Sequence, residues 1–143
     1  MKLTGKILVT IIVCTFSLSN CQKPSYEHRV RNTVVNISFS TNLAQYTDLN
    51  FVGGWLYLKG GSNGILVYRA SQEDMKAYDR QAPYQVVNEC QVIVDSNSTT
   101  TCSDTCSGSQ WLLLDGQIIK GPASLPLKAY NVSFDGENVT ITN

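Results

Sequence analysis

The chain has 143 residues, of which 43% are hydrophobic and 15% are charged, and its eleven basic and eleven acidic side chains leave no formal net charge. This length is sufficient for one domain and leaves little room for a second. Because there is no basic excess to neutralise a phosphate backbone, we do not expect nucleic-acid binding. Asn, Ser, Thr and Gly make up about a third of the residues, and Val and Ile are far more frequent than Ala. Such a mixture favours short strands joined by turns and excludes a helical bundle, a coiled coil or a multidomain enzyme.

The first twenty residues have the layout of an export signal. Lys2 and Lys6 precede the apolar run Ile7–Phe16, which is shorter than the roughly 20 residues that a membrane-spanning helix needs. The following Leu18-Ser19-Asn20-Cys21 resembles the bacterial lipobox, in which a Leu and two small residues precede the cysteine that is acylated. We therefore predict lipid attachment at Cys21. The alternative is an ordinary secretory signal that leaves Cys21 as a structural thiol.

The predicted cleavage divides the chain into a lipoprotein signal peptide (1–20), a tether (21–32) and a β domain (33–143). The tether is polar and holds the only histidine, His28, which we expect to lie on the surface without a metal role. An acylated N-terminal cysteine would hold the domain on a membrane. Gln22, rather than an Asp that would favour the inner membrane, follows Cys21. We therefore expect a lipid-anchored protein of the cell envelope, in the outer membrane and facing the periplasm.

From Thr33 onward short apolar runs alternate with turn residues, which is typical of an all-β domain. The runs that we predict as strands are 34–39, 55–58, 65–69, 75–79, 92–94, 111–114, 117–119, 130–134 and 139–141. Asp115-Gly116 and Asp135-Gly136 make the last four runs into two hairpins. A capped helical turn is predicted at Ser71–Asp74 with Ser71 as N-cap, and the wholly polar stretch 96–101 is predicted as a loop. Strands so evenly spaced, without long helices, predict a small antiparallel sandwich or barrel.

The second half of the chain resembles the Rieske iron–sulfur domain. The motifs that carry the similarity are Ala77–Tyr84, Cys106-Ser107-Gly108-Ser109-Gln110-Trp111, Asp115-Gly116, Gly121-Pro122-Ala123 and Pro126-Leu127. The similarity extends from about Gly64 to Asn143. It implies an all-β, Rieske-like fold with a loop-rich subdomain that binds a [2Fe–2S] cluster in the family.

The resemblance also implies where cluster ligands would stand. A Rieske cluster is held by two thiolates and two imidazoles, which the family supplies as Cys-x-His and Cys-x-x-His. The matching positions hold Ala82 and Tyr84 in the first motif, and Asp104 and Ser107 in the second. None of the four is a cysteine or a histidine, and His28 lies outside both motifs. We therefore expect no [2Fe–2S] cofactor and no bound metal.

Three cysteines, Cys90, Cys102 and Cys106, lie in or beside the two former ligand loops. A metal site would combine their thiolates with one further ligand, Asp104 or Tyr84, but no zinc or ferredoxin spacing is present. A catalytic thiol would need a neighbouring base, and no histidine is available to act as one. A disulfide is natural outside the cytoplasm.

The resemblance implies which cysteines pair. Many Rieske domains carry a disulfide between the two loops, with one cysteine directly before the second histidine position, where this chain has Cys106. Cys90 follows the first motif and is the expected partner; Cys90–Cys102 is the alternative, and one thiol stays unpaired. Closure of such a loop stabilises a domain by about 3 kcal/mol. We expect the disulfide to clamp the loops together in place of the cluster.

The expected function is that of a non-redox accessory or binding module. Its ligand would be a protein partner in the cell envelope, contacted by Tyr84, Trp111 and the loop tips. Alternatively, Tyr84 fills the vacated ligand position and Trp111 belongs to the core. The alternative function is electron transfer by an iron–sulfur centre on Cys90, Cys102 and Cys106. We do not expect an enzyme, because the sequence has no Ser-His-Asp set, no histidine pair for zinc and no Gly-rich phosphate loop.

Overall fold

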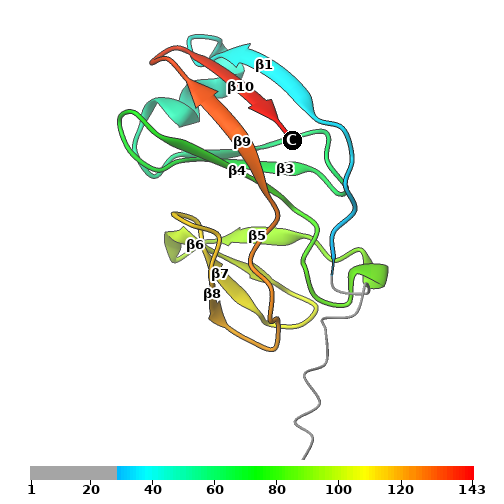
Figure 1. Cartoon of the computed structure of the whole chain (residues 1–143). Coiled ribbons are helices and arrows are strands. Elements are labelled where there is room, and N and C mark those ends of the chain that lie inside the picture. The colour runs from blue at the N-terminus through cyan, green and yellow to red at the C-terminus, as the bar shows by residue number, and fades with distance from the viewer. Residues whose placement is uncertain (1–28) are drawn as a thin grey trace, which may run out of the picture.

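The computed structural model describes residues 29–143, which form two antiparallel sheets (Figure 1). The predicted signal peptide, the predicted lipid-attachment residue Cys21 and His28 lie outside the described residues. Within 29–143, every helix is too short and too polar to cross a membrane.

The larger sheet has six strands in the order β1-β10-β9-β4-β3-β2. Their bounds are β1 Asn36–Ser40, β2 Trp55–Leu58, β3 Ile65–Arg69, β4 Met75–Asp79, β9 Ala129–Phe134 and β10 Asn138–Thr142. Only two residue pairs, Ala77↔Tyr130 and Tyr78↔Ala129, join β4 to β9. The sheet curves around its own core as a half-barrel, and the 3-10 helix η2 (Ala44–Asn50) connects β1 to β2 (Figure 1).

The smaller sheet is inserted in the chain between β4 and β9 and has the order β5-β6-β7-β8. Its bounds are β5 Val92–Asp95, β6 Ser98–Asp104, β7 Gln110–Leu112 and β8 Ile118–Lys120. The short 3-10 helix η3 (Val86–Asn88) precedes β5. In Figure 1 the smaller sheet lies below the half-barrel, and the chain passes between the two layers at the ends of β4 and β9.

Two hydrophobic clusters form the core, and β3 separates them. All five residues of β3 are buried, because successive side chains of a strand point to opposite faces and both faces are covered. Ile65 and Val67 belong to the cluster inside the half-barrel. Leu66 and Tyr68 belong to the cluster between the half-barrel and the smaller sheet. The second cluster therefore packs the smaller sheet and its loops against the half-barrel.

Asp79, the last residue of β4, is fully buried where the chain leaves the half-barrel. Its Oδ2 accepts hydrogen bonds from Ser62 N–H (2.7 Å) and from the Tyr130 hydroxyl (2.6 Å). Its Oδ1 accepts hydrogen bonds from Asn63 N–H (3.3 Å) and Gln81 N–H (2.9 Å). The carboxylate thus joins the β2–β3 turn, the end of β4 and β9 at the junction of the two sheets.

Most predicted strands are confirmed, including β2, β3 and β4 with the predicted bounds. Both Asp-Gly hairpins form, as β7–β8 and β9–β10. The predicted helical turn at Ser71–Asp74 is wrong, because β3 and β4 pair as far as Arg69↔Met75 and the intervening residues must reverse the chain. Ala70 N–H donates to the Asp74 carbonyl (3.0 Å), so this segment is a tight turn between strands.

The predicted loop at 96–101 is also wrong, because β6 begins at Ser98. β6 lies between β5 and β7, and its three consecutive threonines are β-branched residues that favour a strand. The hydroxyl groups of Thr101 and Ser103 donate to the Asp95 carboxylate (2.6 and 2.5 Å). The polar character of this strand therefore reflects its half-exposed face and not a lack of secondary structure.

Candidate functional site

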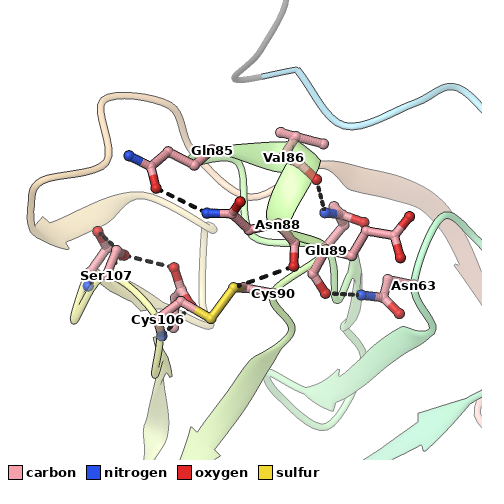
Figure 2. Close-up of a disulfide and its surroundings, with 11 residues drawn as sticks. Asn63, Gln85, Val86, Asn88, Glu89, Cys90, Cys106 and Ser107 are labelled. Carbon is pink, nitrogen blue, oxygen red and sulfur yellow. Dashed lines mark hydrogen bonds between the residues drawn. A yellow bond between two sulfur atoms is a disulfide. The ribbon is translucent and has the colours of Figure 1, made fainter.

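Two loops meet at the tip of the smaller sheet. Loop 1 (residues 80–91) connects β4 to β5 and contains η3, and loop 2 (residues 105–109) connects β6 to β7. Gln85 and Glu89, on either side of η3, have positive φ angles of 46° and 52°. Figure 2 shows the two loops around the bond between Cys90 and Cys106. These loops correspond to the two motifs in which the sequence predicts the former cluster ligands.

A disulfide joins Cys90 of loop 1 to Cys106 of loop 2, with the Cα atoms 6.3 Å apart (Figure 2). This pairing confirms the expected one, and the alternative Cys90–Cys102 pairing is not formed. Cys106 is exposed and Cys90 is half-buried. Ala82 N–H donates to the Cys90 carbonyl (2.8 Å), which closes loop 1 independently of the sulfur atoms. The disulfide therefore joins the two loops, and the Ala82–Cys90 hydrogen bond closes loop 1.

The four positions that match cluster ligands in the Rieske family have structural roles in this chain. Ala82 is fully buried in the cluster beneath the loops. Tyr84 is half-buried and packs against the same cluster. Asp104 is only 1% exposed, and Ser107 lies half-buried beside it in loop 2. The first pair thus contributes to apolar packing, whereas the second pair contributes polar groups.

The second pair belongs to a hydrogen-bonded set that we call the Asp104 network, which consists of Asp104, Ser107 and Ser109. Asp104 Oδ1 accepts from Cys106 N–H (2.9 Å), and Oδ2 accepts from the Ser107 hydroxyl (2.7 Å). The Ser107 and Ser109 hydroxyl oxygens lie 2.8 Å apart, and Ser109 Oγ accepts from Ala123 N–H (2.9 Å). The network therefore ties loop 2 to the β8–β9 connection. Sequence reasoning missed the role of Ser109. In the sequence, Asp104 followed by nearby serines indicates only a turn and does not reveal the contact of Ser109 with Ala123.

The described residues do not provide the ligands of a [2Fe–2S] cluster, which are two thiolates and two imidazoles. Residues 29–143 contain no histidine, and the sulfur atoms of Cys90 and Cys106 are bonded to each other. One group of convergent ligand atoms occurs in this part of the chain: Cys90 Sγ, Cys106 Sγ and an Asp104 carboxylate oxygen, all within 4.8 Å of one another. Cys102 is not a member of this group. The three-cysteine set considered for electron transfer is therefore not brought together.

Trp111 is fully buried, and its Nε1–H donates to the Leu125 carbonyl (3.0 Å). The hypothesis that Trp111 faces a partner is wrong, and the alternative that it belongs to the core is confirmed. The exposed apolar side chain of loop 1 is Val87, with 76% of its surface accessible. Val87 follows Val86 directly, and such a valine pair gives no sequence signal that would show which side chain is exposed.

Cys102, the free thiol of the described residues, lies fully buried in β6. It pairs across the sheet with Val94 on one side and Trp111 on the other. Burial raises the pKa of Cys102 from its ordinary 9.0 to about 12, and the negative charge of Asp95 acts in the same direction. Because the thiolate is the reactive form, this thiol is inert in the folded protein.

The stability of the domain should fall as the pH rises above 9. In the unfolded chain Cys102 loses its proton near 9.0, whereas in the folded protein the proton is retained up to about 12. The unfolded state then binds fewer protons, so stability decreases with a slope that approaches about 1.4 kcal/mol per pH unit above pH 9. Burial also raises the pKa values of Tyr78 and Tyr130 above 10.0, which steepens the fall at higher pH. Urea unfolding at pH 8, 9 and 10 measures the slope. Cys102→Ala should reduce the slope between pH 9 and 10, and an unchanged slope would contradict this assignment.

Comparison with solved structures shows that the chain has a Rieske-like fold. It is similar to the plasma membrane Rieske protein of the cyanobacterium Synechocystis PCC 6803, with 21% identity, a TM-score of 0.56, and coverage of 76% of this chain and 99% of that one. It is also similar to the ferredoxin of carbazole 1,9a-dioxygenase from Nocardioides aromaticivorans IC177, with 16% identity, a TM-score of 0.50, and coverage of 78% and 98%. No family model and no curated protein matches the chain. At such low identity the similarity shows the fold alone.

Proposed function

We propose that this protein is a Rieske-fold accessory or binding module of the cell envelope that carries no [2Fe–2S] cluster and catalyses no reaction. The observation that carries the proposal is the set of residues at the four positions that match the family's cluster ligands. Ala82, Tyr84, Asp104 and Ser107 stand at the four ligand positions, and none offers a thiolate or an imidazole.

The disulfide and the Asp104 network support this proposal because they give the loops an alternative structural link. In a Rieske domain the cluster itself is bound by both loops. In this chain the Cys90–Cys106 bond joins them, and the bond from Ala123 N–H to Ser109 Oγ joins loop 2 to the β8–β9 connection. A scaffold held in this way can present loop 1, with Val87 76% exposed, to a protein partner.

The proposed location follows from the sequence. The apolar run and the Leu18-Ser19-Asn20-Cys21 motif support acylation of Cys21. A cysteine with more than one acyl chain holds a protein stably on a membrane, whereas a single chain does not. We place the domain at the outer membrane, on its periplasmic side, with residues 21–32 as a tether.

Iron analysis of the protein purified after anaerobic expression tests the absence of a cluster. The preparation should be colourless and should contain far less than one iron atom per chain, because none of the four ligand positions holds a cysteine or a histidine. A Rieske protein with its own ligands, expressed in the same host, should be red-brown and shows that the host supplies clusters. Visible absorbance with stoichiometric iron in this chain would overturn the proposal and support electron transfer instead.

Mass spectrometry of the same preparation tests the anchor. The mature wild-type chain should begin at Cys21 and carry acyl chains, whereas Cys21→Ser should carry none. A processed wild-type chain with an unmodified Cys21 would contradict membrane anchoring while leaving the loss of the cluster unaffected.

A further inference from the structure

The tip of the smaller sheet holds three groups that become metal ligands when its disulfide is opened. We propose that reduction of the Cys90–Cys106 bond creates a site for one zinc-like divalent cation on Cys90 Sγ, Cys106 Sγ and the Asp104 carboxylate. These atoms already lie within 4.8 Å of one another in the disulfide form. Cys90 lies at the end of loop 1, Cys106 at the start of loop 2 and Asp104 at the end of β6. The inference goes beyond the proposed function, which concerns the [2Fe–2S] cluster and a protein partner.

The local geometry suits a tetrahedral ion. Zinc–sulfur bonds of about 2.3 Å place two sulfur ligands about 3.8 Å apart, and a zinc–oxygen bond of about 2.0 Å places the oxygen about 3.5 Å from each sulfur. The sulfur atoms of a disulfide are about 2 Å apart, so reduction must separate them by about 1.8 Å. Cys106 is exposed, and its side chain therefore has room to turn away from Cys90 while Asp104 keeps its place.

Asp104 has acceptor capacity left for a cation. A carboxylate has about four acceptor sites, and Asp104 accepts one hydrogen bond on each oxygen. Asp79, which is also a buried carboxylate, accepts four hydrogen bonds. Within residues 29–143 the ion pair between Lys76 and Asp74 is the only one, so Asp104, at 1% exposure, has no ion-pair partner there. Its oxygens are thus already placed beside the sulfur atoms without being saturated.

The charges and ligand types define the class of ion. Two thiolates and one carboxylate carry three negative charges, two of which a divalent cation neutralises. Thiolate ligands favour zinc over magnesium or calcium, which prefer oxygen. Three protein ligands leave the fourth tetrahedral position to water, as in zinc sites with an open position. The exposure of Cys106 provides the entry path.

The redox step uses a dithiol reductant. Thiol–disulfide exchange breaks the Cys90–Cys106 bond and leaves two thiols, while the reductant becomes a disulfide; two electrons and two protons pass to the protein. Metal binding then releases the two thiol protons to solvent. The site therefore binds metal only when the Cys90–Cys106 disulfide is reduced.

Cobalt titration of the full chain tests the site. Cys14→Ser and Cys21→Ser are introduced so that the only thiols are those of the described residues, and Co²⁺ serves as a coloured substitute for Zn²⁺. The reduced protein should bind one Co²⁺ per chain with the visible bands of tetrahedral thiolate coordination, and Zn²⁺ should displace it. The oxidised protein should show no such bands. Cys90→Ser and Cys106→Ser should abolish them, and Asp104→Asn should weaken binding at least about tenfold.

Two variants outside the group serve as matched controls. Cys102→Ala removes a thiol and Asp95→Asn removes a carboxylate of the same sheet. Both should leave cobalt affinity within about twofold of the parent, which is the Cys14→Ser/Cys21→Ser protein, because neither residue belongs to the ligand group. The comparison of oxidised with reduced parent needs no further substitution and holds even if a variant fails to fold. Absence of cobalt bands in the reduced parent, equal bands in the oxidised parent, or unchanged affinity in folded Asp104→Asn would overturn the proposal. Since the readout is cobalt and not iron, such a failure leaves the cluster-free function untouched.

Discussion

Replacement of Asp79 by alanine should lower the free energy of unfolding by about 4 kcal/mol. The fully buried carboxylate accepts hydrogen bonds from three backbone N–H groups and from one tyrosine hydroxyl. Each buried donor left without an acceptor costs about 1–3 kcal/mol, and partial relaxation of the cavity keeps the total near 4 kcal/mol. Urea unfolding followed by the fluorescence of Trp55 and Trp111 measures the loss.

Two variants show whether burial is the cause of this loss. Tyr130→Phe removes only one of the four donors and should cost about 1 kcal/mol. Asp135 also accepts hydrogen bonds, from Glu137 N–H and from Asn138 N–H and Nδ2–H, but it lies exposed in the β9–β10 turn. Asp135→Ala should therefore leave stability close to that of the wild type, because water replaces the lost acceptor. Equal losses for Asp79→Ala and Asp135→Ala would contradict the role of Asp79 as the buried junction.

The strands that can be predicted from the sequence are those made of apolar runs, most clearly where the apolar side chains are buried on both faces of the strand. β3 and β4 are continuous or alternating apolar runs because their two faces line the two hydrophobic clusters. β6 could not be recognised in this way, since Thr99 and Thr100 are exposed and the hydroxyl groups of Thr101 and Ser103 donate to Asp95. η2 was missed because it buries only Leu49 and therefore has no apolar period.

In the candidate site, the features that depend on local sequence could be predicted, whereas contacts between distant segments could not. The residues at the four ligand positions could be named because motifs are local, and the Cys90–Cys106 pairing followed from the family resemblance. Three cysteines alone permit three pairings. The hydrogen-bond partners could not be predicted, because Asp79 contacts Ser62 and Tyr130 at sequence separations of 17 and 51. Such contacts depend on how the sheets pack and leave no pattern in either segment.

Removal of the Cys90–Cys106 disulfide should lower the free energy of unfolding by about 3 kcal/mol. The bond spans 16 residues of sequence, and its loss lets the unfolded chain sample more conformations. The double variant Cys90→Ala/Cys106→Ala measures this effect by urea unfolding without reductant. Little packing is lost at the same time, because Cys106 is exposed and Cys90 is only half-buried.

Reductant provides the matched test of this effect. The wild type should lose the same ~3 kcal/mol when its disulfide is reduced, whereas the double variant should be insensitive to reductant. Cys102→Ala should keep the full sensitivity, since its thiol takes no part in the bond. The reduced domain should nevertheless stay folded, because the Ala82–Cys90 backbone hydrogen bond and the Asp104 network hold the loops without the sulfur atoms. If the wild type and the double variant unfold at the same urea concentration without reductant, the disulfide does not stabilise the domain by clamping the loops.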